Sequence, residues 1–178
     1  RHPLVADVNT RFDVPHSRFN DVTRAQFEQA GLRILVESET AGVHLATSAD
    51  GFRIVFFQGH PEYDTVSLLK EYKREVARFS KGERPDYPPL LANYFSPKAQ
   101  AILDEHRERV VAAHAQGKIV PEFPEPLIGG SLDNTWHDTA EAVIDNWVGK
   151  VYQITNHDRR LPFQQNINPN DPLGLRQR

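Results

Sequence analysis

The chain has 178 residues, of which 39% are hydrophobic and 25% charged, a composition typical of a folded globular domain rather than a disordered segment. Its formal net charge is −3 and its charged residues are scattered, so no basic surface for nucleic acid is indicated. No apolar run approaches the roughly 18 residues that cross a bilayer, the first residues do not resemble a secretory leader, and the lack of cysteine in these 178 residues excludes disulfides and thiolate metal sites among them.

Three segments in the first third of the chain predict consecutive β-strands. Residues 32–37 (LRILVE), 43–48 (VHLATS) and 52–57 (FRIVFF) are rich in branched and aromatic residues. The Asp50-Gly51 pair before the third segment is typical of a short hairpin connection. Because residues 54–57 are all apolar, we expect that strand to be buried on both faces, with helices of this chain covering only one of them.

The third strand is followed by two titratable residues, His60 and Glu62. In an extended chain, positions i and i+2 point to the same side, so we expect the two side chains to reach hydrogen-bonding distance if the strand continues through Pro61. A carboxylate beside an imidazole orients it and stabilises the imidazolium, as in a general base. In open α/β sheets, ligands bind beyond the carboxyl ends of strands, where His60 falls.

Two other interpretations of this segment remain open. Both side chains could simply be solvated at a strand end. A metal site would use His60, Glu62 and Asp64, but no second histidine stands at a recognisable ligand spacing, so we expect no metal.

The rest of the chain predicts helices. Residues 64–82 carry apolar side chains at helical spacing, with Asp64 as a candidate cap and Gly82 as a stop. Ser96-Pro97 predicts the start of a second helix that reaches about residue 116. Residues 118–133 are interpreted as a loop. A third helix from Asn134 places six apolar residues on one face: Trp136, Ala140, Val143, Trp147, Val151 and Ile154.

Several motifs carry a family resemblance. The run FFQGHPEYD (56–64), followed by TVSLLKEYKRE, resembles the signature of the homoserine O-acyltransferases, the family of homoserine O-succinyltransferase. The upstream run VPHSRFNDV (14–22) resembles that family's second motif, and NTWHDTAEAVIDNWVGKVYQIT with the closing DPLGL resembles its C-terminal helix and tail. The likeness extends from residue 1 to about residue 175.

The resemblance implies an α/β fold, specifically the C-terminal part of a flavodoxin-like, class I glutamine amidotransferase-like fold with a Cys-His-Glu triad. It makes residues 1–178 the C-terminal portion of one acyltransferase domain, with an insertion-like stretch at 97–133 and an extended tail at 156–178. The family's cysteine and lysine have no counterpart here. We therefore expect that an N-terminal half is missing and that the chain alone is inactive.

The resemblance also implies an activity, acyl transfer from an acyl-CoA to the hydroxyl of homoserine in methionine biosynthesis through a cysteine thioester. His60 matches the base and Glu62 the residue that orients it, while Ser17 and Arg74 match substrate-binding positions. The acyl-CoA is a substrate, so no cofactor is expected, and succinyl-CoA is favoured over acetyl-CoA. A cytoplasmic enzyme is expected, and a homodimer is a further option.

Two alternatives compete with this assignment. A glutaminase domain also ends its triad on His-Pro-Glu, but such domains usually stop soon after that motif, whereas a long segment follows Glu62 here. A non-catalytic binding subunit would have lost its nucleophile, and only a cysteine in the parent reading frame would exclude it. Without the family match, Arg74 would be interpreted as a solvated helix residue and Ser17 as a turn residue.

Overall fold

The computed structural model describes residues 2–176, which divide into two units. Unit 1 consists of residues 2–62 and 135–176, and unit 2 consists of Tyr63–Asn134. Unit 1 contains η1 (Pro3–Val5), α1 (Arg24–Gln29), β1 (Arg33–Ser38), β2 (Gly42–Thr47), β3 (Val55–Phe57) and α5 (His137–Ile154). Unit 2 contains α2 (Ser67–Ser80), α3 (Pro97–Ala115), α4 (Glu125–Ile128) and η2 (Gly129–Ser131).

The three predicted strands form one antiparallel sheet in the order β1-β2-β3. The register pairs Leu45 with Phe57, and β1 is irregular between Ile34 and Glu37. The third strand is shorter than predicted because Asp50 closes a turn before it, accepting a hydrogen bond from the backbone N–H of Phe52 at 2.9 Å. The structure therefore confirms an α/β chain with a small sheet.

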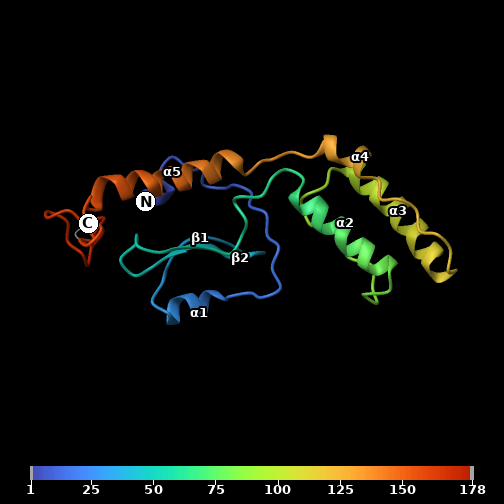
Figure 1. Ribbon diagram of the computed structural model, residues 1–178, viewed down its shortest axis with the longest axis horizontal. Coiled ribbons are helices and arrows are strands. Elements are labelled where there is room, and N and C mark those ends of the chain that lie inside the picture. Colours follow the sequence, from blue (N-terminus) through green and yellow to red (C-terminus); the bar gives the residue numbers. More distant parts are fainter. Residues whose placement is uncertain (1, 177–178) are drawn as a thin grey trace. The chain divides into compact units, whose positions relative to one another are not determined.

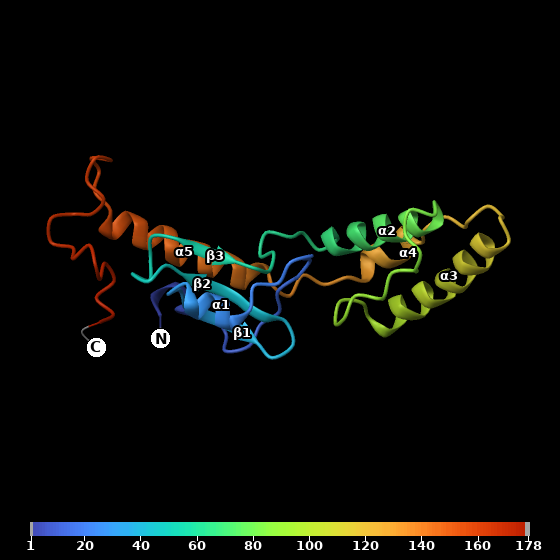
Figure 2. The ribbon, with the colours of Figure 1, turned by 90° about the horizontal axis from the view of Figure 1, so that it is seen from below.

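Helices of unit 1 pack on both faces of this sheet, on one of them over only a part. Figures 1 and 2 show the strands between α5 and α1. On the α5 side, Val143 packs in a cluster with Leu45 and Phe57. On the α1 side, Phe27 packs with Val43 and Ala46. The expectation that only one face would be covered is wrong, because the six-residue helix α1, which the apolar periodicity did not predict, covers part of the second.

The apolar run of the third strand is only partly enclosed. The exposed fraction of Ile54 is 53%, and residues 55–57 are half-buried rather than fully buried. The expected burial of this strand on both faces is therefore incomplete among the described residues.

The predicted apolar face of α5 is the face that packs inward. Trp136, Val143 and Ile154 are buried. The tail that follows α5 folds back on this helix, because Phe163 forms a bridge with Thr155 and packs with Ile154. Asn146 also ties α5 to the N-terminal segment by donating a hydrogen bond to the carbonyl oxygen of Ala6 at 2.9 Å.

Unit 2 is a helical unit with its own core. Side chains of α2, α3, α4 and the segment before α3 meet in one cluster of buried residues: Leu69, Tyr72, Val76, Phe95, Ala99, Leu103 and Ile128. The Ser96 hydroxyl caps α3 as predicted, accepting the backbone N–H of Ala99 at 3.2 Å. The helix predicted from Asp64 begins at Ser67, without a side-chain cap, and the predicted loop 118–133 contains α4 and η2.

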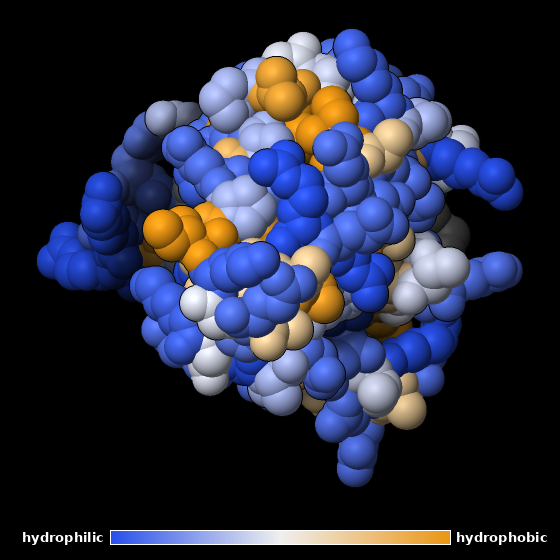
Figure 3. Space-filling view, turned by 90° about the vertical axis from the view of Figure 1, so that its right-hand side faces the viewer, coloured by the Kyte–Doolittle hydropathy of each residue, from blue (hydrophilic) through white to orange (hydrophobic). Residues whose placement is uncertain are grey.

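The face of the molecule in Figure 3 is mainly hydrophilic, with hydrophobic side chains in separate small groups. Val111, Ile119 and Leu127 are the exposed large apolar residues of unit 2. Scattered apolar residues of this kind are ordinary on protein surfaces. None of the helices within residues 2–176 is long and apolar enough to cross a membrane.

Candidate functional site

His60 lies just beyond β3, where the backbone leaves the sheet. Residues 58–59 bend and residues 61–62 form a turn. Gln58 extends the strand pairing by donating its backbone N–H to the carbonyl oxygen of His44 at 2.9 Å. The backbone N–H of His60 then donates to the carbonyl oxygen of Pro15 at 2.7 Å. Hydrogen bonds to two separate segments therefore fix the backbone that carries the imidazole.

The predicted contact between His60 and Glu62 is confirmed. Nδ1 of His60 lies 2.8 Å from Oε1 of Glu62, and the two side chains are 32% and 66% exposed. The contact arises in a turn rather than from the alternation of an extended strand, so the geometric reason expected from the sequence does not hold. A carboxylate on Nδ1 orients the ring and stabilises the imidazolium, as in a general base.

Ser17 contacts the same imidazole through its main chain. The carbonyl oxygen of Ser17 lies 3.0 Å from Nε2 of His60, although 43 residues separate the two in sequence. The Ser17 hydroxyl is not part of this contact. The structure therefore brings together three of the four predicted site residues, namely His60, Glu62 and Ser17.

Arg74, the fourth predicted residue, belongs to unit 2. It lies on α2 with its side chain 61% exposed, and its Nε is 3.5 Å from Oε1 of Glu75. Glu75 is also paired with Arg78 and Arg84 at shorter distances of 3.3 and 3.0 Å. The contact of Arg74 with Glu75 is long, and Glu75 is shared with two other arginines. The Arg74 guanidinium therefore lies largely in solvent.

Two further histidines surround the base, and the sequence patterns had not singled them out. The rings of His16 and His44 lie 5.8 Å apart, edge to face. Burial lowers the pKa of His44 to about 4, with a smaller contribution from His16. Burial, Arg18 and His60 lower the pKa of His16. Both rings are therefore neutral at neutral pH, and Glu62 lies within hydrogen-bonding distance of His60, whereas Asp21 acts on His16 only through its charge.

Gly59 makes this close packing of rings feasible. A Cβ at position 59 would lie 2.6 Å from Cγ1 of Val14, 2.8 Å from Nδ1 of His44 and 3.0 Å from Nε2 of His16. Any side chain here would displace the segment that carries His60. The only indication of this close packing in the sequence was Gly59 itself, next to His60.

A small cavity of about 10 Å³ lies beside these rings, lined mainly by apolar side chains of unit 1 such as Phe12, Phe57 and Trp136. Its volume is about that of one water molecule. A larger hollow of about 460 Å³ lies along β1 and includes none of the predicted site residues. Neither cavity identifies a ligand.

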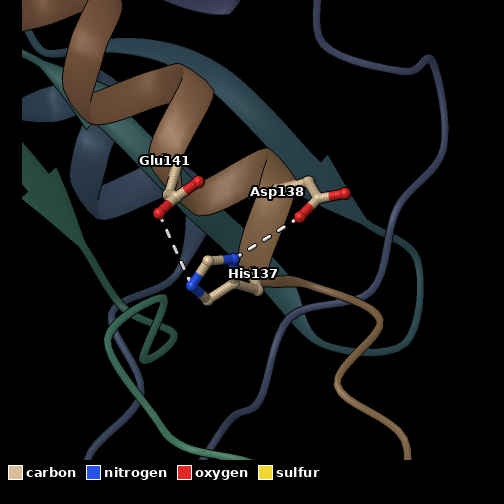
Figure 4. Close-up of side chains that lie close together, drawn as sticks. All are labelled: His137, Asp138 and Glu141. Carbon is tan, nitrogen blue, oxygen red and sulfur yellow. Dashed lines mark hydrogen bonds and ion pairs between the residues drawn. The ribbon is translucent and has the colours of Figure 1, made fainter.

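One group of side chains within residues 2–176 has metal-ligand chemistry, at the first turn of α5. Figure 4 shows His137 between Asp138 and Glu141. Its Nδ1 is 3.4 Å from Asp138 and its Nε2 is 3.5 Å from Glu141. All three residues are exposed. Because all three side chains are exposed and exposed acidic groups are common without an ion, we assign no ion to this group.

Comparisons with known proteins give a consistent result. A family model described as homoserine O-succinyltransferase matches residues 1–157. A protein of Allochromatium vinosum named homoserine O-succinyltransferase is 70% identical over 174 residues, which are 98% of this chain and 49% of the relative. Proteins of the same name from Thioalkalivibrio nitratireducens and Nitrosococcus oceani are 68% and 65% identical, again over 97–98% of this chain and 49% of each relative. The chain thus spans about half the length of these relatives.

Proposed function

The chain belongs to the homoserine O-succinyltransferase family, and on that premise we propose that it supplies the general base for acyl transfer from succinyl-CoA to the hydroxyl of L-homoserine. The observation that carries this proposal is the 2.8 Å contact between Nδ1 of His60 and Glu62. This contact gives the imidazole the orientation and the charge partner that a base needs. The reaction belongs to methionine biosynthesis.

The proposed reaction has two steps. In the first, a cysteine thiolate attacks the thioester carbonyl of the acyl-CoA, the carbon–sulfur bond to CoA breaks, and the CoA thiolate takes a proton from the imidazolium. In the second, the homoserine hydroxyl attacks the acyl-cysteine, His60 takes its proton, and the enzyme's carbon–sulfur bond breaks. Since the 178 residues contain no cysteine, the nucleophile would come from a part of the enzyme outside this sequence.

The remaining predicted residues have proposed roles in binding. Arg74 offers a planar fork of donors that suits a carboxylate, and its exposure leaves that fork accessible. Ser17 contributes its hydroxyl to substrate and its carbonyl to His60. The fold that we propose for the complete enzyme is flavodoxin-like, as in class I glutamine amidotransferases, with the chain as the C-terminal portion of one acyltransferase domain.

A chimera tests the proposal directly. The matching 174 residues of the Allochromatium vinosum relative are replaced by those of this chain, and steady-state transfer to homoserine is measured with succinyl-CoA and with acetyl-CoA. We expect transfer, with succinyl-CoA preferred. His60→Ala should lower turnover by about 10²–10⁴-fold, the contribution of a positioned base. Glu62→Gln should also be severe, because an amide holds the ring but lacks the charge that stabilises imidazolium.

Two controls complete the experiment. His157→Ala changes an exposed histidine of unit 1 outside the predicted site and should leave turnover unchanged. Arg74→Lys should raise the KM for homoserine or for the acyl donor more than it lowers kcat, because lysine keeps the charge but loses the fork. Thermal melts show which variants are folded. Near-normal turnover in folded His60→Ala would refute the base assignment, and an inactive unsubstituted chimera would favour a non-catalytic binding role.

A further inference from the structure

Arg18 makes three contacts that converge beside the base. Its guanidinium donates to the carbonyl oxygen of Ala41 at 2.6 Å and pairs with Asp21 at 2.8 Å. It also contacts Nδ1 of His16. The Arg18 side chain is 21% exposed and that of Asp21 is 58% exposed, so the ion pair lies at the surface, whereas the contacts with Ala41 and His16 are partly buried. Because arginine has donors only, Nδ1 of His16 must be the acceptor, which places that ring's proton on Nε2.

These contacts tie one loop to the sheet. Ala41 lies in the turn between β1 and β2, and a Cβ at the next residue, Gly42, would be in ordinary van der Waals contact with Nη2 of Arg18 at 3.8 Å. The loop that Arg18 secures in this way, residues 15–18, supplies both carbonyl groups that hold His60. The carbonyl of Pro15 accepts the backbone N–H of His60 at 2.7 Å, and that of Ser17 faces Nε2 at 3.0 Å.

We propose that Arg18 is a positioning residue for His60, fixing the Ser17 carbonyl that accepts a hydrogen bond from Nε2 of the base. The inference rests on the proposed function. With Glu62 on Nδ1 and Ser17 on Nε2, both ring nitrogens face acceptors. Two acceptors facing the ring stabilise the imidazolium, the form that exists between taking and returning the substrate proton.

The guanidinium suits this role better than other side chains do. It presents several donors in one plane, so a single side chain can satisfy a backbone carbonyl, a carboxylate and an imidazole together. Lysine could keep the charge and one of these bonds, and glutamine could keep one bond without the charge. Burial and, second to it, the Arg18 guanidinium lower the pKa of His16, so that ring carries no charge that would repel the imidazolium of His60.

Arg18→Gln in the chimera tests the inference, with Arg24→Gln as the matched control. Arg24 is also an ion-paired arginine of unit 1, but its partners are Glu28 and Glu37 at the surface. We expect Arg18→Gln to lower kcat by about 10–100-fold, the usual cost of misplacing a catalytic group by about 1 Å. The KM for homoserine should stay within about twofold, and Arg24→Gln should leave both constants unchanged.

A second readout does not depend on activity. Nitrogen-15 NMR of labelled histidine rings follows the Nε2–H signal of His60, assigned by its loss in His60→Asn. We expect Arg18→Gln to shift this signal to that of a solvent-bonded ring, and Arg24→Gln to leave it in place. An inactive parent chimera would refute the proposed function, and the NMR comparison would still decide the role of Arg18.

Three outcomes would overturn the inference. A raised KM for homoserine with unchanged kcat would make Arg18 a substrate ligand. Kinetics and NMR signals equal to those of Arg24→Gln would show that the loop holds its place without Arg18. If Arg18→Gln does not fold, Arg18→Lys replaces it, since lysine keeps the charge and one donor for Ala41. An intermediate kcat supports the inference, and wild-type kcat with an unmoved NMR signal refutes it.

Discussion

At the scale of single residues, Gly59 has a steric role. Gly59→Ala places a Cβ 2.6 Å from Val14 and 2.8 Å from His44, so the free energy of unfolding should fall by about 1–3 kcal/mol, as in other overpacked sites. Urea denaturation followed by circular dichroism measures the change. Gly149→Ala is the control, since nothing lies within 4 Å of that position in α5. Alanine should stabilise a helix there by about 0.5–1 kcal/mol. Equal effects of the two substitutions would contradict the predicted clash.

His44 should make the stability of the protein depend on pH. Its pKa is about 4 in the folded chain, against 6.5 for an ordinary histidine, so on acidification the unfolded chain binds this proton first. The stability due to the neutral ring is therefore complete above pH 6.5 and lost as the pH falls from 6.5 to about 4. The loss should reach about 3 kcal/mol.

Comparison with His44→Leu isolates this effect. Leucine cannot take up a proton, so the variant should lose less stability between pH 6.5 and about 4 than the unsubstituted protein. Burial also lowers the pKa of His2 to about 4, which leaves a smaller pH dependence in the variant. Urea midpoints across this pH range test the prediction. Parallel curves for the two proteins would show that His44 titrates equally in the folded and unfolded chains.

At the scale of elements, the start of α3 depends on a side chain and the start of α2 does not. The Ser96 hydroxyl accepts a backbone N–H of α3, whereas α2 begins at Ser67 without a side-chain cap. Ser96→Ala should therefore cost about 0.5–2 kcal/mol, and Ser67→Ala should stay within about 0.5 kcal/mol. Thermal unfolding of both variants gives the comparison. A larger effect at Ser67 would mean that the cap is not what stabilises α3.

The side-chain caps of α3 and α1 differed in how easily each could be recognised in the sequence. Ser96-Pro97 precedes a long periodic segment, so the helix was predicted. Thr23 and Gln26 form a reciprocal capping box at the start of α1, and the T-x-x-Q spacing was legible in the sequence. The helix that follows has six residues and buries one side chain, Phe27. Such a short helix has no apolar periodicity to detect, and it forms because it packs on the sheet.

At the scale of the whole molecule, each unit has its own hydrophobic core. Leu103 is fully buried in the core of unit 2, so Leu103→Ala should cost that unit about 2–5 kcal/mol. Hydrogen exchange should then accelerate for amides of α2 and α3, and much less for amides of β2. The control Leu127→Ala removes a side chain that is 67% exposed and should leave exchange nearly unchanged. Equal acceleration in β2 would show that the two units unfold as one.

The sequence by itself determined the strands, the three long helices, the cap of α3 and the pairing of His60 with Glu62. These features depend on neighbours within a few residues, because periodicity and caps act along the local backbone. Even so, the His60–Glu62 contact forms in a turn instead of an extended strand. The family resemblance was also present in the sequence, since its motifs are contiguous runs.

Only the tertiary structure decided what surrounds the base. The Ser17 carbonyl reaches Nε2 of His60 across 43 residues, and Arg18 reaches Ala41 across 23. Gly59 is needed because Val14, His16 and His44 converge on it from two other segments. No local pattern encodes these contacts, because they arise when separate segments pack on a common sheet. Each backbone donor or acceptor that is buried there must then find a partner.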